Sequence, residues 1–238
     1  MPDSGMSSYD PFAPDYDVWA EAMTEDVGWY VSLAADADEP IVELAVGTGR
    51  VAVPIATETG KRVVGIDASP AMLGIARERS AGLPIELRQG DMRDLVLEEP
   101  VQLIICPFRS MLHLPTWADR RRVFERVASS LQPGGRFAWN VFAFSAQLAA
   151  ALDGKRTERP GGNWEIVRNV PADSRIDLTR GKGVERFGTI SLWWATTREW
   201  EGLIDVAGLE LEALYGGFHR EPYDDDSLEQ VWVSRKPD

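Results

Sequence analysis

Cysteine is almost absent from this chain of 238 residues, with Cys106 as its single example. One thiol excludes an internal disulfide framework and fits a reducing compartment, so we expect a cytoplasmic protein. Long apolar runs are also missing, since none approaches the roughly 20 residues that a membrane-spanning helix needs. Residues 1–17 contain neither a basic nor an apolar segment, which argues against a signal peptide. We therefore expect no contact with a membrane.

Positive charge is scarce as well. Lysine and arginine total 25 against 38 aspartate and glutamate residues, which gives a formal net charge of −13. A surface that binds nucleic acid needs clustered basic side chains. The nearest candidate, the run from Arg120 to Arg122, lies in an amphipathic stretch and is better explained as a solvent-facing side of a helix. Nucleic acid is therefore not an expected partner.

What is present indicates a globular α/β chain. Hydrophobic residues make up 44% of the sequence, and the length suffices for a sizeable core in one domain with an insertion. Residues 41–45 form a short apolar run typical of a buried strand, and a turn at 46–49 contains Gly47 and Gly49. Helical spacing follows over 50–59, then a second strand over 62–66 that ends at Asp67. This predicts one β-α-β unit.

Such a unit binds a nucleoside-bearing cofactor at the carboxyl edge of a parallel sheet. The glycines let the cofactor approach the backbone, and an acid at the end of the second strand accepts hydrogen bonds from ribose hydroxyls. Two cofactors fit. Gly47-x-Gly49-x-x-Ala52 with Asp67 about 20 residues on satisfies a relaxed dinucleotide fingerprint. That pattern alone leaves an NAD(P)-dependent oxidoreductase open.

The segment Glu43-Leu44-Ala45-Val46-Gly47-Thr48-Gly49-Arg50 resembles the first motif of class I S-adenosylmethionine (SAM)-dependent methyltransferases. Ala45 stands where that family commonly has a glycine, which we interpret as a mild change in strand geometry. Three further strings resemble the family in order and spacing: residues 67–73, residues 89–95, and the Leu-x-Pro-Gly-Gly string at 131–135. The resemblance implies a Rossmann-like sheet with helices on both faces, and SAM as the cofactor.

The resemblance also implies which residues contact that cofactor. In the family the first acid lies under the glycine turn, and the acid after the third strand accepts the adenine amino group. Tyr-Asp pairs near the N-terminus resemble those of a cap that covers the SAM pocket. The implied set is Tyr9, Tyr16, Glu43, Ala45, Gly47, Gly49, Asp67, Ala68, Met72, Asp91, Met92 and Pro107.

Residues 107–115 resemble the acceptor loop of glycine and sugar N-methyltransferases, which often reads Ser-x-x-His-Leu. The resemblance makes His113 and Tyr16 the candidates for a catalytic role, and Arg109, Met111 and His219 the candidates for substrate contact. We favour His113 as a pocket contact over a general base, because a shifted pKa cannot be recognised from sequence. No metal-ligand cluster is visible in the sequence, so we expect no metal site.

The chain divides into four parts on these patterns. Residues 1–35 form an N-terminal helical cap, 36–144 the SAM-binding core, 145–197 an insertion, and 198–238 a last helix with closing strands. Within the insertion, three runs of alternating polar and apolar residues predict an antiparallel sheet of about three strands. Trp193 and Trp194 must point to opposite faces of it. A homodimer through this insertion stays open.

We therefore expect a SAM-dependent methyltransferase that transfers the methyl group to a nitrogen or oxygen of a small-molecule metabolite by in-line displacement. A non-catalytic SAM-binding protein would carry the same motifs, so it stays open beside the oxidoreductase. The oxidoreductase leaves Glu43, Asp91 and the 131–135 string unexplained and lacks an evident Tyr-x-x-x-Lys pair. The sequence does not identify the acceptor.

Overall fold

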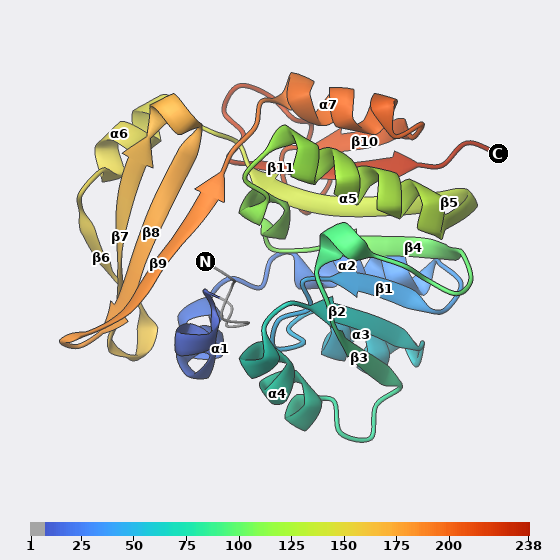
Figure 1. The fold of residues 1–238 in the computed structure, drawn as a ribbon, viewed down its shortest axis with the longest axis horizontal. Helices are drawn as coiled ribbons and strands as arrows, with labels where there is room; N and C mark the ends of the chain where they lie inside the picture. The colour runs from blue at the N-terminus through green and yellow to red at the C-terminus, as the bar shows by residue number, and fades with distance from the viewer. Residues whose placement is uncertain (1–7) are drawn as a thin grey trace.

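The computed structural model describes residues 8–238, and Figure 1 shows two sheets that stand side by side. The larger has seven strands in the order β10-β11-β5-β4-β1-β2-β3. Its strands are β1 (Ile41–Leu44), β2 (Val63–Asp67), β3 (Ile85–Gln89), β4 (Val101–Cys106), β5 (Leu131–Phe142), β10 (Glu210–Tyr215) and β11 (Glu229–Arg235). Strands β1 to β5 pair in parallel, whereas β11 pairs antiparallel with both β5 and β10. This confirms the predicted α/β fold class.

Alternate residues of the strands face two separate cores, as the period of a β-strand requires. Ile41, Leu103 and Ala138 pack on one face, against α2 (Val27–Ala35), α3 (Ala52–Thr59) and α4 (Pro70–Arg79). Val42 and Trp139 pack on the other face, against α5 (Trp117–Ser130) and α7 (Thr197–Val206). Because both faces are covered, the central strands are apolar at nearly every position.

Strand β1 pairs with β2 on one side and with β4 on the other. The strand order reverses there, and open α/β sheets bind ligands in the crevice outside the carboxyl ends at such a point. The helix termini agree with their sequence signals. Gly60 ends α3 at φ 70°, and Ser69 caps α4 by accepting a hydrogen bond from the Met72 backbone N–H at 3.1 Å.

The insertion forms the second sheet, at the left of Figure 1, and all its pairings are antiparallel. Its strands are β6 (Arg156–Glu158), β7 (Asn163–Val170), β8 (Arg175–Lys182) and β9 (Glu185–Trp193), preceded by α6 (Ala146–Leu152). The three predicted runs correspond to β7, β8 and β9. Strand β6 is too short for a recognisable alternation, so the sequence missed it.

The N-terminal segment contains η1 (Asp10–Phe12) and α1 (Ala13–Ala20), which lie between the two sheets (Figure 1). Phe12 is 2% exposed and packs with Met72 of α4 and Phe187 of β9. Four further 3-10 turns complete the element order: η2 (Met92–Asp94), η3 (Ser110–His113), η4 (Pro160–Gly162) and η5 (Pro171–Asp173). No helix among residues 8–238 is long and apolar enough to cross a membrane.

Candidate active site

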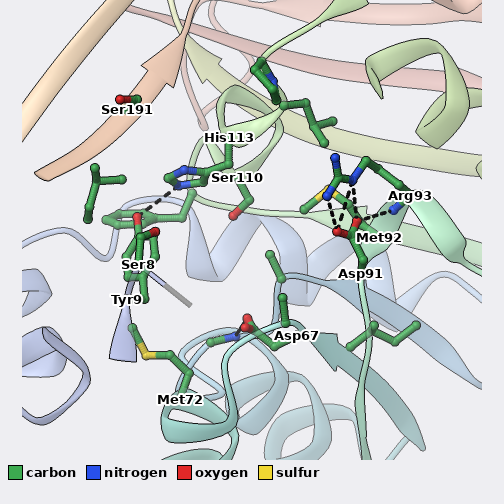
Figure 2. Close-up of a pocket in the computed structure, with 18 of the residues that line it drawn as sticks. Ser8, Tyr9, Asp67, Met72, Asp91, Met92, Arg93, Ser110, His113 and Ser191 are labelled. Atoms are coloured by element: carbon green, nitrogen blue, oxygen red, sulfur yellow. Dashed lines mark hydrogen bonds and ion pairs between the residues drawn. The ribbon is translucent and has the colours of Figure 1, made fainter. Parts of the chain in front are cut away.

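A cavity of about 500 Å³ opens at the carboxyl ends of β1 to β4. Figure 2 shows Asp67 and Met72 on one side of it and Ser110, His113 and Ser191 on the other. We call the side built by residues 45–94 the floor. The opposite side consists of residues 8–20, 107–115 and 189–193, and we call it the roof. The volume falls within the roughly 300–1,000 Å³ of small-molecule sites.

The floor centres on the turn after β1. Ala45, Gly47 and Gly49 have φ of 55°, 57° and 79°, the left-handed region that glycine occupies without strain. The Gly47 N–H donates to Asp67 Oδ2 at 2.8 Å, and the Ser69 N–H donates to Asp67 Oδ1 at 2.7 Å. These bonds fix the carboxylate at the cavity wall. The expectation of a mild strand change at Ala45 is wrong, because β1 ends at Leu44 and the turn needs a positive φ.

Electrostatics on the floor follow from burial. Burial raises the pKa of Asp67, and the hydrogen bonds from the backbone of Ser69 and Gly47 oppose this rise. Glu43 is 2% exposed, and its Oε2 atom has no hydrogen-bond partner among the described residues. Burial holds the pKa of Glu43 well above its usual range, which favours the protonated form beneath the turn.

The far end of the floor is formed by η2. Burial raises the pKa of Asp91, but the hydrogen bonds from Arg93 outweigh this and hold it below its usual value. Arg93 also donates to Asp119 at 3.0 Å, so its guanidinium is occupied by two carboxylates. Met92 lines the cavity beside this pair, and Met72 and Ala68 line it from the start of α4.

The roof contains a hydrogen-bonded pair of aromatic residues. The Tyr9 hydroxyl lies 3.0 Å from Nε2 of His113, and the two rings meet edge to face with centroids 5.3 Å apart. His113 also forms a hydrogen bond with the backbone of Ser191. Burial, helped by the positive charge of Arg180, lowers the pKa of His113 to about 4. His113 is therefore neutral at pH 7.

Strand β9 supplies the rest of the roof. Thr189, Ser191 and Trp193 line the cavity at alternate positions, with Ile190 between the first two. Trp194, the residue after β9, does not line the cavity and stacks on Phe144 with centroids 3.9 Å apart. Only one of the two adjacent tryptophans therefore lines the cavity, as expected from the alternation of side chains along a strand. Tyr16 also lines the cavity, and burial raises the pKa of its phenol, which stays protonated.

Arg180 of β8 is a feature that the sequence analysis missed. Its side chain is buried, with 4% of the residue exposed, and its guanidinium lies 3.8 Å from the centroid of Trp19 and 4.9 Å from that of Phe12. A cation over aromatic faces is attracted by the ring quadrupoles. Arg180 therefore connects the second sheet to the N-terminal cap. Its place in an alternating strand gave no signal for this contact.

Several predicted site residues do not line the cavity. Arg109 is exposed and pairs with Glu229 beside a second cavity of about 150 Å³. Met111 is fully buried in the core, and His219 is exposed in the segment between β10 and β11. The lining of the main cavity therefore gives no support to a substrate contact by these three residues. Glu43, Gly49 and Pro107 lie behind the lining, where they support the turn and the loop.

The donor set of the floor fits a nucleoside-bearing cofactor. It offers a fixed carboxylate at Asp67 for ribose hydroxyls, a second one at Asp91, and methionine surface at Met72 and Met92 for a ring face. The turn brings backbone into the cavity at Gly47, where an added Cβ would meet only the Ala45 carbonyl oxygen at 4.0 Å. A long flexible ligand can therefore lie directly over this backbone.

Comparisons with known proteins agree with this geometry. A family model described as "Methyltransferase domain" matches residues 41–135. The chain is 24% identical over 241 residues to a cypemycin N-terminal methyltransferase of a Streptomyces species, covering 97% of this chain and 98% of that one. It is 28% identical over 208 residues to the dTDP-3-amino-3,4,6-trideoxy-alpha-D-glucopyranose N,N-dimethyltransferase of Streptomyces venezuelae, covering 82% and 86%. The solved CcbJ methyltransferase of Streptomyces caelestis gives a TM-score of 0.84 at 25% identity, covering 99% and 100%.

Proposed function

We propose that this chain, which belongs to the class I SAM-dependent methyltransferases, methylates an amine nitrogen of a small molecule. Its cofactor is SAM, which supplies a methyl group already activated by the attached sulfonium. The protein must then hold the nucleophile in line with the bond that breaks and keep water away. The floor and the roof divide this work between them.

The observation that carries the choice of nitrogen is the neutral His113. A base that removes a proton from a hydroxyl must bind that proton well, and a group with a pKa of about 4 does so poorly. A neutral amine already has a free lone pair, so it needs no strong base. His113 then serves as a hydrogen-bonding contact, held by Tyr9 and the Ser191 backbone.

On the floor, we assign SAM contacts to the residues that line the cavity. Asp67 accepts hydrogen bonds from the ribose hydroxyls, and Asp91 accepts one from the adenine amino group. Met72 and Met92 pack against the faces of the adenine ring. The Ala45–Gly47 backbone lies under the methionine end. Tyr9 and Tyr16 close the cavity from above, which excludes water from the reacting atoms.

The relatives support an amine acceptor. One is named as an N-terminal methyltransferase and another as an amino-sugar N,N-dimethyltransferase. The acceptor side of the cavity is lined by Ser110, Thr189, Ser191 and Trp193, which offer hydroxyl groups and one large aromatic face. We infer a small acceptor that carries an amine on a polar scaffold. An oxidoreductase gains no support from these relatives.

The test begins with calorimetric titrations of SAM, S-adenosylhomocysteine and NADH. We expect both adenosyl ligands to bind and NADH not to bind. A screen of matched amine and alcohol pairs with SAM then asks whether products gain a methyl group. Methylation of amines alone supports the proposal. Methylation of alcohols alone would contradict it, and binding without any turnover would favour a SAM-binding protein that is not an enzyme.

The pH dependence sharpens the test. If the acceptor enters as a neutral amine, kcat/KM rises with pH up to the pKa of that amine and levels off above it. Acceptors of different pKa should move the inflection with them. An inflection that stays fixed for all acceptors would instead indicate a titrating group of the enzyme.

The proposal also includes a cytoplasmic location and a homodimer formed through the second sheet. The single thiol, Cys106, is buried, which agrees with a protein of the reducing cytoplasm. A homodimer through the second sheet would double the mass in solution, and light scattering measures it. A monomer would remove the insertion from consideration as an interface.

A further inference from the structure

Two adjacent residues of the acceptor loop, Phe108 and Arg109, have φ of 57° and 65°. This left-handed region is uncommon for residues other than glycine, and for a bulky residue it is an outlier. Such backbone persists where the surrounding structure holds it from several sides, and it concentrates at functional sites. Phe108 itself lines the cavity, and Ser110 and His113 follow it in η3.

A buried amide on the neighbouring strand provides the first hold. Asn140 of β5 is 2% exposed, and its Oδ1 atom accepts the Phe108 backbone N–H at 2.8 Å. The same Oδ1 atom accepts the Tyr30 hydroxyl of α2 at 3.0 Å. The Asn140 Nδ2 group donates to Glu229 Oε2 of β11 at 3.3 Å. The orientation of the amide is thus set by a donor on one side and a carboxylate on the other.

A second set of contacts connects Asn140 to Arg109 through Glu229. Glu229 also accepts the Arg109 guanidinium, with Nε at 2.8 Å from Oε1. Asn140 therefore fixes the backbone of one strained residue, and through Glu229 it fixes the side chain of the next. The Phe108 ring is held in turn by the Arg50 guanidinium, 4.3 Å above its centroid. None of these polar groups lines the main cavity, so they act on it only through the loop.

We propose that Asn140 is a positioning residue for methyl transfer, which sets the Phe108–His113 loop so that Phe108, Ser110 and His113 face the cavity. The role in methyl transfer rests on the proposed function, whereas the contacts that fix the loop are observed directly in the structure. Asn140 does not line the cavity assigned to the cofactor and the acceptor. Its effect passes through the backbone N–H of Phe108 and the Glu229–Arg109 ion pair.

The first experiment compares Asn140→Ala with a matched control, Gln230→Ala. Gln230 is a buried amide of β11, 3% exposed, that donates to Thr197 and Tyr223 on the opposite face of the sheet. Hydrogen–deuterium exchange of the segment 107–114 is measured with and without S-adenosylhomocysteine. Exchange in Asn140→Ala should be about tenfold faster, because a lost buried hydrogen bond opens the loop. Gln230→Ala should leave this segment as in the wild type.

The second experiment exchanges the amide and the carboxylate. Asn140→Asp keeps an acceptor for the Phe108 N–H but places a carboxylate against Glu229, so the loop should loosen. The double variant Asn140→Asp with Glu229→Gln restores one donor and one acceptor at this contact. It should recover most of the protection of 107–114. Recovery by a reversed pair is expected for a specific hydrogen bond and not for general destabilisation.

Kinetics separate positioning from folding. With an amine acceptor from the screen, Asn140→Ala should lower kcat by about 10- to 100-fold, since small misplacements near the reacting atoms have effects of that size. The Kd for SAM should change far less. Unchanged exchange at 107–114, equal effects of Asn140→Ala and Gln230→Ala, or no recovery in the double variant would overturn the proposal. If the wild type binds no SAM, the proposed function fails, while the exchange contrast still decides the role of Asn140 in the loop.

Discussion

The floor of the cavity is built by one unbroken stretch of chain, whereas the roof is assembled from three distant segments. Residues 45–94 carry every floor residue, and together with β1, which precedes them, they form one β-α-β-α-β run. The roof combines residues 8–20, the loop 107–115 and the end of β9 at 189–193. The matched family segment, 41–135, contains the whole floor but neither the cap nor β9. We infer that the floor serves the shared cofactor and the roof the individual acceptor.

The largest effect is expected on the floor, from Asp67→Ala. This change removes the acceptor of the Gly47 and Ser69 N–H groups and the carboxylate assigned to the ribose. Hydrogen bonds to charged groups contribute about 1.5–3 kcal/mol, so the Kd for SAM should rise about 100-fold in calorimetry. Asp225→Ala, at an exposed turn, is the control. An unchanged Kd would break the assignment of the floor to the cofactor.

The next effect concerns the roof and its dependence on pH. The pKa of His113 is about 4 in the folded protein, below the ordinary value of about 6.5. At a pH between these two pKa values, the imidazole is protonated in the unfolded chain but not in the folded one. The native state therefore becomes less stable as pH falls from about 6.5 to about 4. His113→Gln should reduce the loss of unfolding free energy between pH 7 and pH 5 by about 1–2 kcal/mol, allowing for partial solvent contact.

Urea unfolding at the two pH values measures this difference. His219→Gln is a suitable control, because it removes the other histidine of the chain at an exposed position. An equal loss of stability on acidification in the wild type and in His113→Gln would show that the roof does not hold a neutral imidazole. The amine argument would then lose its support.

A smaller effect is expected from a change that separates the two causes of the low pKa of His113. Burial is the larger cause and the Arg180 charge the lesser one. Arg180→Met keeps an apolar side chain under Trp19 and removes the charge, so the pKa of His113 should rise but stay below its ordinary value. NMR titration of the ring follows it. Arg186→Met, exposed on β9, should leave it unchanged. A fall in the pKa would contradict the assigned influence of Arg180 on the roof.

The smallest effect returns to the floor, at Ala45. A left-handed conformation costs a residue with a Cβ roughly 1–2 kcal/mol, and glycine avoids this cost. Part of the stabilisation is lost again, because glycine has more conformational freedom in the unfolded chain. Ala45→Gly should therefore raise the free energy of unfolding by about 0.5–1 kcal/mol. Gly74→Ala in α4, where an added Cβ meets nothing within 4 Å, tests the reverse change in a helix and should also stabilise. Destabilisation by Ala45→Gly would show that the turn does not strain alanine.

The sequence predicted the floor because its signals are local. An apolar strand, a turn with two glycines and an acid at the end of the next strand lie within 27 residues, from 41 to 67, and the parallel sheet then brings them to one edge. The roof was only partly predictable. Tyr9, Tyr16 and His113 were named from family resemblance and do line the cavity, whereas Arg109, Met111 and His219 were named on the same ground and do not.

The sequence by itself determined the fold class, the strand faces and the SAM-binding unit, since hydrophobic periodicity and turn chemistry act over a few residues. The tertiary structure alone decided which distant groups meet. Arg180 lies over the cap aromatics, Asn140 holds the Phe108 N–H, and the half-buried His113 packs against Tyr9 and lies beside β9. A pKa near 4 and a strained loop both arise from these long-range contacts. Burial and charge depend on packing, which no local pattern records.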